Sequence, residues 1–286
     1  MSVSLYDTLG AESTEFIVSQ TELKTLFTTK DKIQVLTKLK AKGMIQTVKT
    51  IVCFDRSVSE EAEKAANEAG FELLFFHELV EEGKQLDTEL TEPAADDIYT
   101  FCYTSGTTGT PKGAMITHKN IVGDAAGAIH VVFDATHADV HFSYLPLAHL
   151  FERLMIMTAY ATGMAVGFYQ GDVLKLREDL AELRPTIMPS VPRLYNRFYD
   201  IMQSRLRELT GVKKKIAEWG IARKLANLDY DGRVTHSVYD RILFNKFKAI
   251  LGGRIRLMCT GSAPIAKEVL NFLRIAFCCH IQEGYG

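Results

Sequence analysis

The sequence predicts an α/β protein with layered sheets and helices, because of its alternating segments and the placement of its prolines. Short apolar runs alternate with amphipathic segments, which is the pattern of strands buried between helices. Four prolines fall at segment edges, where a missing N–H is tolerated: Pro146, Pro185, Pro189 and Pro192. With 286 residues, of which 47% are apolar, the chain is long enough to bury a sizeable core.

Seven apolar runs are predicted strands and seven amphipathic segments are predicted helices. The strands are 50–55, 71–76, 98–104, 141–146, 165–170, 186–191 and 254–259, and a further strand is expected before Gly284. The helices are 59–69, 119–131, 174–183, 193–209, 213–228, 239–250 and 267–277. The polar stretch 84–97 has neither pattern and predicts a linker. We therefore expect a partial first α/β subdomain at 1–90 and a second at 91–286.

The uncharged stretch 154–171 is long enough to cross a membrane. Polar side chains dilute it, however, and Gly163 divides it into a helix-like half and a strand-like half. We therefore expect a buried helix followed by a buried strand. The three basic helices between 193 and 250 are expected to present solvated faces, and Trp219 to be a packing residue.

Charge and cysteine usage narrow the class of partner and the compartment. A net charge of -2 offers no general attraction for nucleic acid, so we expect no nucleic-acid partner. The five cysteines have no C-x-x-C spacing and no signal peptide precedes them, so we expect reduced core thiols in a cytoplasmic protein. The spacing of His130, His137 and His141 matches no metal-ligand pattern.

Residues 103–113, YTSGTTGTPKG, form a glycine- and hydroxyl-rich segment directly after a predicted strand. Glycines let successive N–H groups converge on an anion, and the hydroxyls and the Lys112 ammonium add donors. The kinase-type P-loop does not fit, because Pro111 stands where its second glycine belongs and Gly113 follows the lysine. The sequence thus predicts a site for a triphosphate or a pyrophosphate; a flexible polar turn is the alternative.

Four further motifs accompany this loop: YLPLAHLFER at 144–153, PSVPRLYNRFYD at 189–200, CTGSAP at 259–264 and IQEGYG at 281–286. Together they resemble the adenylate-forming superfamily and, within it, the long-chain acyl-CoA synthetases. The resemblance implies the layered α/β N-terminal domain of that fold, in incomplete form. In the family, GYG continues with a threonine and a glutamate, so we expect a fragment that lacks the mobile C-terminal domain.

The resemblance also implies an activity. Such ligases join a long-chain fatty acid to CoA at the expense of ATP, through an acyl-adenylate, with AMP and pyrophosphate as products. The expected cofactors and co-substrates are ATP, Mg²⁺ and CoA, with peripheral contact to endoplasmic reticulum, peroxisomal or other intracellular membranes. We expect the chain by itself not to turn over efficiently. A truncated, non-catalytic nucleotide- or lipid-binding protein is the alternative.

The family's site residues carry over onto the matching motifs. Lys112 and His149 are expected to be catalytic, with His149 donating a hydrogen bond to the reacting carboxylate, and Thr104 is expected to contact Mg²⁺. A satisfied core histidine is the alternative for His149, and a plain strand-to-helix turn is the alternative for CTGSAP. The expected nucleotide-binding residues are Tyr103, Thr104, Ser105, Gly106, Thr107, Thr108, Gly109, Lys112, Gly261, Ser262, Ala263, Pro264, Gln282, Glu283, Gly284, Tyr285 and Gly286.

Overall fold

The computed structural model describes residues 1–6, 9–104, 111–261 and 263–284. The chain divides into two compact units, Met1–Lys119 and Asn120–Gly286. This division by compactness falls later than the subdomain boundary that the sequence predicts at residue 90, which remains a prediction. The two units are taken one at a time below.

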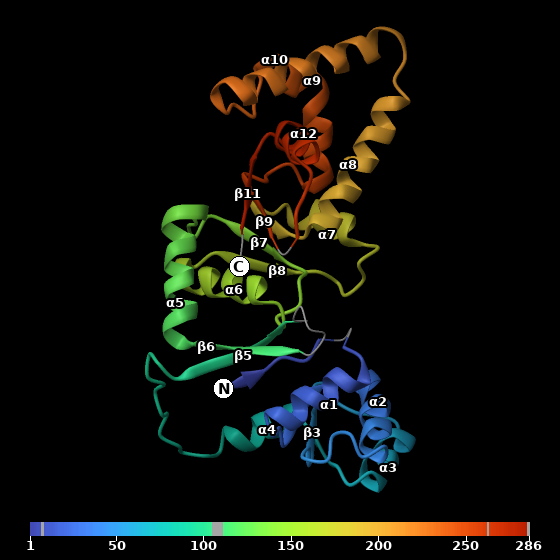
Figure 1. Ribbon diagram of the computed structural model, residues 1–286, viewed down its shortest axis with the longest axis vertical. Helices are drawn as coiled ribbons and strands as arrows, with labels where there is room; N and C mark the ends of the chain where they lie inside the picture. The colour runs from blue at the N-terminus through green and yellow to red at the C-terminus, as the bar shows by residue number, and fades with distance from the viewer. Residues whose placement is uncertain (7–8, 105–110, 262, 285–286) are drawn as a thin grey trace. The chain divides into compact units, whose positions relative to one another are not determined.

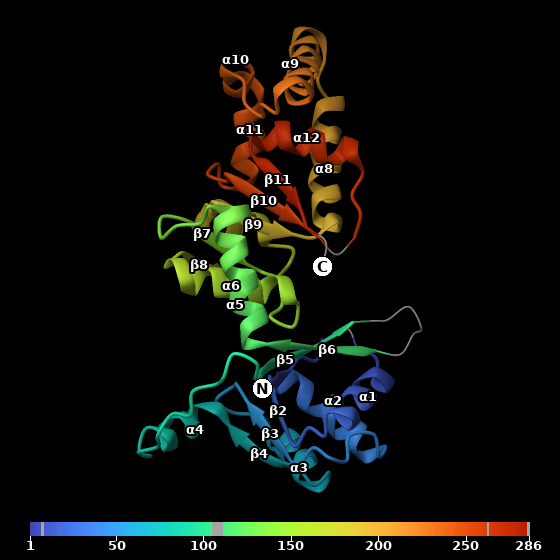
Figure 2. The ribbon, with the colours of Figure 1, turned by 60° about the vertical axis from the view of Figure 1, so that its left-hand side comes forward.

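The first unit contains a parallel sheet of three strands in the order β2 (Thr25–Thr28), β3 (Thr50–Cys53) and β4 (Glu72–Phe75) (Figure 2). Helix α2 (Lys30–Ala41) connects β2 to β3, and α3 (Glu60–Glu68) connects β3 to β4. Together with α1 (Ala11–Gln20) they bury an apolar core around Ile51 and Cys53. The sequence predicted α3, whose N-cap Ser59 accepts a hydrogen bond from the Ala62 N–H, but missed β2, α1 and α2.

A second sheet of this unit runs β1 (Ser2–Val3), β5 (Ile98–Thr104), β6 (Lys112–Thr117). Strands β5 and β6 are antiparallel and form the two arms on either side of residues 105–110. The sequence predicted β5 but treated the start of β6 as loop. After α4 (Phe76–Gly83), residues 84–97 are exposed and form neither helix nor strand, as the predicted linker requires.

The second unit is built on a parallel sheet with the order β11-β10-β9-β7-β8 (Figure 1). Four of these strands had been predicted as short apolar runs, and the fifth as the strand before Gly284. Strand β10 begins three residues later than predicted. The bounds are β7 (Val140–Ser143), β8 (Ala165–Phe168), β9 (Ile187–Ser190), β10 (Leu257–Thr260) and β11 (His280–Glu283).

Alternating residues of the strands belong to two different apolar clusters, because successive side chains of a strand point to opposite faces of the sheet. Ile187 and Leu257 pack with α6 (Leu150–Thr162) and the π-helix η1 (Ala128–Phe133), which follows α5 (His118–Gly127). Met188 and Met258 pack with the helices of the other face. Those helices are α7 (Leu176–Leu183), α8 (Pro192–Arg207), α9 (Gly211–Asp231), α10 (Ser237–Tyr239), η2 (Asp240–Phe244), α11 (Asn245–Lys248), η3 (Ala249–Leu251) and α12 (Lys267–Phe277).

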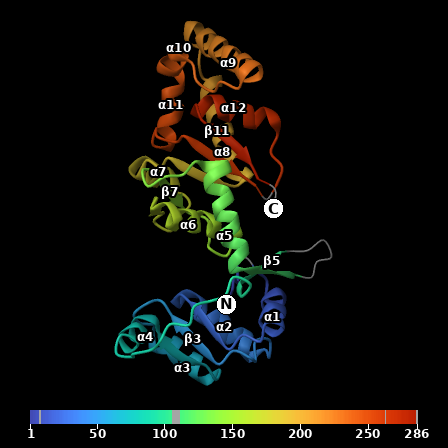
Figure 3. The same ribbon diagram turned by 90° about the vertical axis from the view of Figure 1, so that its left-hand side faces the viewer.

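This is a layered α/β arrangement, in which α12 lies beside β11 and packs against α8, α9 and α11 (Figure 3). The fold class predicted from the sequence is therefore confirmed. Regular α-helix was predicted across 239–250, and the structure instead places a π-helical turn and a 3₁₀ turn around the short α11.

The uncharged stretch 154–171 forms the predicted helix and strand, α6 and β8. Gly163 ends α6 with φ of +71°, a left-handed conformation that suits glycine. The expectation that the strand is buried is wrong, because β8 lies at the sheet edge and leaves Phe168 75% exposed. None of the described helices combines the length and the apolar content that a membrane span requires.

Of the two expectations for the basic helices, that of a packed Trp219 is wrong, whereas the basic residues of α9 are exposed as expected with the exception of Lys224. Trp219 on α9 is 63% exposed rather than packed. Lys224, five residues further along α9, is completely buried. Its ammonium lies 2.5 Å from Asp240 Oδ1 and 2.6 Å from the Ile275 carbonyl, and 4.1 Å from the centre of the Phe244 ring. One lysine of the basic helix α9 is therefore internal, and its ammonium links α9 to η2 and α12.

Candidate functional site

The strand order of the second unit marks a particular edge of its sheet. The chain runs from β7 outward to β8 and then returns to the other side of β7 to form β9, β10 and β11. Ligands of open parallel sheets bind at the carboxyl ends of the strands, beside the point where the order reverses. That point lies between β7 and β9, whose register pairs only His141 with Ile187.

Two hydroxyls bridge the carboxyl ends of β7 and β9. Tyr144, directly after β7, lies with its Oη 2.6 Å from Oγ of Ser190, the last residue of β9. Ser190 is fully buried, and burial raises the pKa of Tyr144 to about 12, so the phenol stays neutral. Both residues lie inside the motifs at 144–153 and 189–200, but neither was among the predicted site residues. They also lie inside the predicted strands 141–146 and 186–191, so their place at the ends of two neighbouring strands became visible only with the observed strand bounds and strand order.

His149 lies on the segment that leaves β7 and is the N-cap of α6. Its Nδ1 accepts a hydrogen bond of 3.2 Å from the Phe151 N–H, which places the proton of the neutral ring on Nε2. Burial lowers the pKa of His149, and the nearby Glu152 opposes that shift without cancelling it. The imidazole is therefore a neutral Nε2–H donor, which is the form that the predicted role requires. The same cap gives His149 a structural role as well.

Beneath this cap lies a completely buried pair, His141 of β7 and Glu152 of α6. His141 Nε2 and Glu152 Oε1 are 3.0 Å apart, and both side chains are 0% exposed. His141 Nδ1 and Glu152 Oε2 have no hydrogen-bond partner among the described residues. The pair fixes the first turn of α6 against β7 and so holds the segment that carries His149. No group of three or more His, Cys, Asp or Glu in the described ranges could hold a metal ion.

The structure brings the CTGSAP and IQEGYG motifs together at the same sheet edge. The Gly284 N–H donates to the Thr260 carbonyl over 2.8 Å, and a Cβ added at Gly261 would lie 3.1 Å from the Gly284 carbonyl oxygen. The close approach therefore favours glycine at position 261, whereas a Cβ at Gly284 would meet only the Thr260 carbonyl oxygen, at an ordinary contact distance of 3.8 Å. The buried Thr260 hydroxyl, which the sequence analysis did not select, has no partner among the described residues.

The structure describes some of the remaining predicted nucleotide-binding residues of this edge and leaves others outside the described ranges. Gln282 and Glu283, on the edge strand β11, are exposed, as are Ala263 and Pro264 after β10. Exposed side chains and backbone at the end of a sheet are accessible to a ligand. Ser262, Tyr285 and Gly286 lie outside the described residues, so their predicted roles remain predictions.

The first unit holds the two ends of the predicted phosphate loop in register. Thr104 on β5 pairs with Lys112 on β6, and Tyr103 pairs with Gly113, whose missing Cβ would lie 2.9 Å from the tyrosine ring. The Tyr103 hydroxyl donates to Gln20 Oε1 at 2.6 Å, which ties the hairpin to α1. Lys112 and Thr104 are exposed. The loop residues Ser105, Gly106, Thr107, Thr108 and Gly109 lie outside the described residues.

A clamp of charged and polar groups lies at the opposite, amino edge of the second unit's sheet. Asp139, Thr186 and Arg256 directly precede β7, β9 and β10. Arg256 donates to both carboxylate oxygens of Asp139, at 2.8 and 2.7 Å, and Thr186 donates to one of them at 2.7 Å. Burial alone would raise the pKa of Asp139, but these hydrogen bonds outweigh it and hold the pKa well below its usual range.

The fold and the site have counterparts in known proteins. The family model of the AMP-binding enzymes matches residues 1–286. The chain is 41% identical, over 287 residues, to the peroxisomal long chain acyl-CoA synthetase 7 of Arabidopsis thaliana, of which it covers 40%. It is 39% identical to the long-chain-fatty-acid–CoA ligase 1 of Cavia porcellus, with 99% of this chain and 41% of the relative covered. The chain thus spans about two fifths of the length of these relatives.

The fold also matches solved structures. The adenylation domain of a carboxylic acid reductase from Segniliparus rugosus, solved with AMP and a carboxylic acid, superposes with a TM-score of 0.73. The match covers 100% of this chain and 44% of that one, at 23% identity. At this level of identity the likeness concerns the fold.

Proposed function

The chain belongs to the AMP-binding enzyme family, and from that membership we propose that it supplies the nucleotide-binding part of a long-chain fatty acid–CoA ligase. The identity of 39–41% to long-chain acyl-CoA synthetases supports the choice of substrate class. One structural observation carries the proposal: the Gly284–Thr260 hydrogen bond joins the two glycine motifs at the carboxyl edge of the sheet. The activity proposed is that of the whole ligase, of which this chain corresponds to part.

The proposed reaction has two steps. A fatty carboxylate oxygen attacks the α-phosphorus of ATP and pyrophosphate leaves, which gives an acyl-adenylate. The CoA sulfur then attacks the acyl carbon, AMP leaves with the electron pair of the broken C–O bond, and the thiol gives up its proton. The first step turns a poor leaving group into a good one. It needs the charge on the phosphates to be neutralised along the line of attack.

We assign phosphate neutralisation to the β5–β6 hairpin. Lys112 provides an exposed ammonium at one end of the loop, and the Thr104 hydroxyl lies opposite it in register. The donor set fits a Mg²⁺ that arrives with ATP, since Mg²⁺ usually keeps waters and substrate phosphates as ligands rather than an all-protein cage. Bound there beside Thr104, Mg²⁺ would supply charge neutralisation on the phosphate oxygens.

His149 and the glycine motifs take the other two roles. The neutral His149 ring can donate from Nε2 to a carboxylate oxygen, and its N-cap bond keeps that tautomer in place. The backbone of Gly261 and Gly284, with Gln282 and Glu283 on β11, lines the proposed adenine site. Thr260, whose hydroxyl lacks a described partner, is the residue that we add to the predicted set.

We also propose a compartment and a membrane contact for the protein. Peroxisomal relatives in Arabidopsis thaliana support an intracellular organelle, with peripheral membrane contact as part of the same proposal. Fractionation of cells expressing the protein, with salt washes of the membrane pellet, would test it. Recovery only in the soluble fraction would contradict the membrane contact.

The binding test uses the 286-residue chain, AMP and alkyl-adenylate esters of increasing chain length in calorimetric titrations. We expect Gly261→Val to weaken binding of AMP by about tenfold or more, the loss of about 1.4 kcal/mol, because its side chain would displace the Gly284 carbonyl. Gly123→Val is the matched control, since a Cβ at Gly123 meets nothing within 4 Å.

The chain-length series separates the two functional hypotheses. Tighter binding of the long-chain esters supports the ligase. AMP binding with no dependence on the alkyl chain supports a nucleotide-binding protein without that activity. If AMP does not bind, or if Gly261→Val binds it as the control does, the proposed adenine site is wrong.

A further inference from the structure

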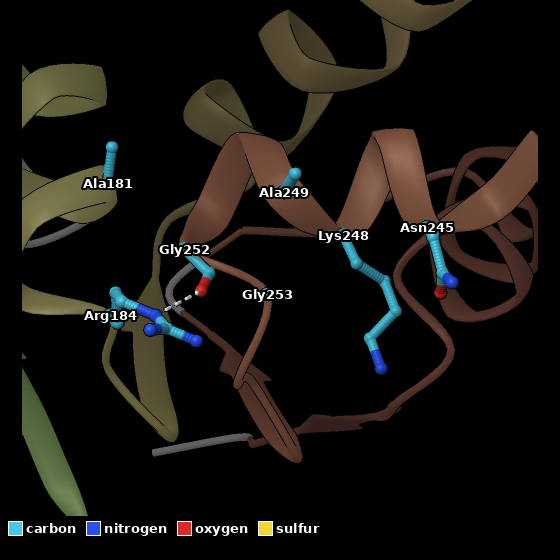
Figure 4. Close-up of a pocket in the computed structure, with 7 residues that line it drawn as sticks. All are labelled: Ala181, Arg184, Asn245, Lys248, Ala249, Gly252 and Gly253. Atoms are coloured by element: carbon cyan, nitrogen blue, oxygen red, sulfur yellow. Dashed lines mark hydrogen bonds between the residues drawn. The ribbon is translucent and has the colours of Figure 1, made fainter. Parts of the chain in front are cut away.

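A small cavity of the second unit lies on the amino side of its sheet, where α7 and η3 end before β9 and β10. It has a volume of about 340 Å³, close to the lower limit for small-molecule sites. Figure 4 shows the residues that line it: Ala181, Arg184, Asn245, Lys248, Ala249, Gly252 and Gly253. None of these described lining residues is acidic.

The backbone around the cavity takes a conformation that requires particular residues. Arg184, Gly252 and Gly253 all have positive φ, at +51°, +80° and +78°. A Cβ at Gly252 would lie 2.5 Å from the Leu180 carbonyl oxygen, so only glycine allows the end of η3 to approach the end of α7. Arginine is uncommon in the left-handed region, where glycine or asparagine is the usual helix cap. The presence of an arginine at this left-handed position therefore suggests that its side chain has a specific role.

The Arg184 guanidinium is fixed but only partly used. Its Nε donates to the Gly252 carbonyl at 3.1 Å, and its two terminal nitrogens have no hydrogen-bond partner among the described residues. The Lys248 ammonium likewise has no hydrogen bond or ion pair in the described part of the chain, although the Lys248 carbonyl accepts from the Gly253 N–H. Arg184 is exposed and Lys248 is half-buried, so water screens their mutual repulsion, but two cations that line one cavity without an acidic side chain both gain from a bound anion.

Helix capping does not account for this pair. Cations are favoured at helix C-termini, and the single Arg184–Gly252 bond fits that role. Lys248, however, bonds no carbonyl of the described residues. Arg256, on the same side of the sheet, makes the contrast clear, since Asp139 neutralises it through two hydrogen bonds. Arg184 and Lys248 have the donors for an anion and lack such a carboxylate.

We propose that Arg184, Lys248 and Asn245 form a binding site for the phosphate group of a small soluble molecule. The two terminal guanidinium nitrogens suit two oxygens of one phosphate, and Lys248 adds a point charge. The Asn245 amide can donate a further hydrogen bond. The site is separate from the carboxyl edge, so it stands whether or not the proposed ligase activity is correct.

The test is calorimetric titration of the 286-residue chain at low ionic strength with inorganic phosphate, glycerol 3-phosphate and phosphate-free glycerol. We expect saturable binding of both phosphates and none of glycerol. Lys248→Gln and Arg184→Gln should each weaken phosphate binding by about tenfold or more, because each variant removes at least one charge-assisted hydrogen bond. Tighter binding of glycerol 3-phosphate identifies a phosphate ester as the ligand class, and equal binding identifies the phosphate group alone.

The control is Lys246→Gln, which removes the same charge from the same helix at a residue that does not line the cavity. Its affinity for phosphate should stay within about twofold of the unmodified chain. The Lys248 ammonium makes no hydrogen bond or ion pair to the described protein, so Lys248→Gln should keep the thermal midpoint and remains informative if Arg184→Gln unfolds.

Three results would overturn the site. The first is the absence of saturable phosphate binding, and the second is equal phosphate affinity of Lys248→Gln and Lys246→Gln. The third is that Lys112→Gln loses all phosphate binding while the cavity variants Arg184→Gln and Lys248→Gln keep it. The last result would place the phosphate at the β5–β6 loop and leave the proposed ligase function intact.

Discussion

The strands of the second unit's sheet begin at its amino edge and end at its carboxyl edge, and the buried polar groups at these two edges differ in how fully they are hydrogen-bonded. At the amino edge, Asp139 receives hydrogen bonds from Arg256, Thr186 and the Thr136 N–H. At the carboxyl edge, the buried Thr260 hydroxyl has no described partner, and neutral Tyr144 and Ser190 share one hydrogen bond. The amino-edge clamp is thus a stabilising element, whereas the carboxyl edge keeps groups that a ligand can satisfy.

This difference has a physical cause. A carboxylate as buried as Asp139 is tolerated only when charge and hydrogen bonds compensate it, so the clamp around it must be complete in the folded protein. A binding edge gains affinity from donors and acceptors that remain unused until the ligand arrives. Variants at the two edges should therefore separate stability from ligand binding.

The largest expected effect is on the amino edge. Arg256→Met leaves the Asp139 carboxylate buried without its partner, and we expect a loss of about 3 kcal/mol in the free energy of unfolding. This figure is at the low end of the range for buried pairs because the Arg256 side chain is 40% exposed. Urea denaturation measures it. Adding Asp139→Leu should recover part of the loss; a double variant less stable than Arg256→Met would contradict the clamp.

The same pair predicts a pH dependence. The folded-state pKa of Asp139 is depressed, so its contribution to stability is present above the unfolded value of about 4 and is lost as the pH falls through the folded value. The stability difference between the unmodified chain and Arg256→Met should therefore be constant at neutral pH and shrink below about pH 4. A difference that stays unchanged into strong acid would show that the ion pair is not its source.

A smaller effect is expected at the switch point of the carboxyl edge. Tyr144→Phe removes the hydroxyl that bridges to Ser190, and we expect it to cost about 1 kcal/mol in stability. Its effect on the binding of alkyl-adenylate esters should be larger than that of Arg256→Met. Ser190→Ala, and the double variant, complete a cycle with a coupling of similar size. Additive losses would mean that the two hydroxyls do not interact.

The smallest effect is expected from His149→Asn, which retains a side chain that can cap α6. Burial depresses the pKa of His149, so the folded state favours the neutral ring. The stability that this contributes is present above about pH 6.5 and falls as the pH drops through the lowered pKa. His149→Asn should remove that dependence while it weakens the binding of alkyl-adenylate esters at pH 7.5. An unchanged slope of stability below pH 6.5 would exclude His149 as its origin.

The comparison also indicates why prediction of the site was uneven. The sequence analysis selected Gly261 and Gly284 from their motifs, and the structure brings them together. It selected His149 but could not foresee its N-cap bond. It missed Thr260, Tyr144 and Ser190, because a hydroxyl acquires a role only when neighbouring strands place it at a shared edge. The clamp of Asp139 and Arg256 spans 117 positions and has no local pattern.

The sequence by itself determined the α/β class, most strands of the second unit, the division of 154–171 at Gly163 and the family, since these depend on local periodicity and short motifs. Only the tertiary structure decided the strand order, and with it which strand lies at an edge and where the switch point falls. It also decided the burial of Lys224 and the exposure of Trp219, because burial depends on which helices pack together. Local patterns fix the conformation of each segment, whereas the partners of a polar group come from segments far apart in the chain.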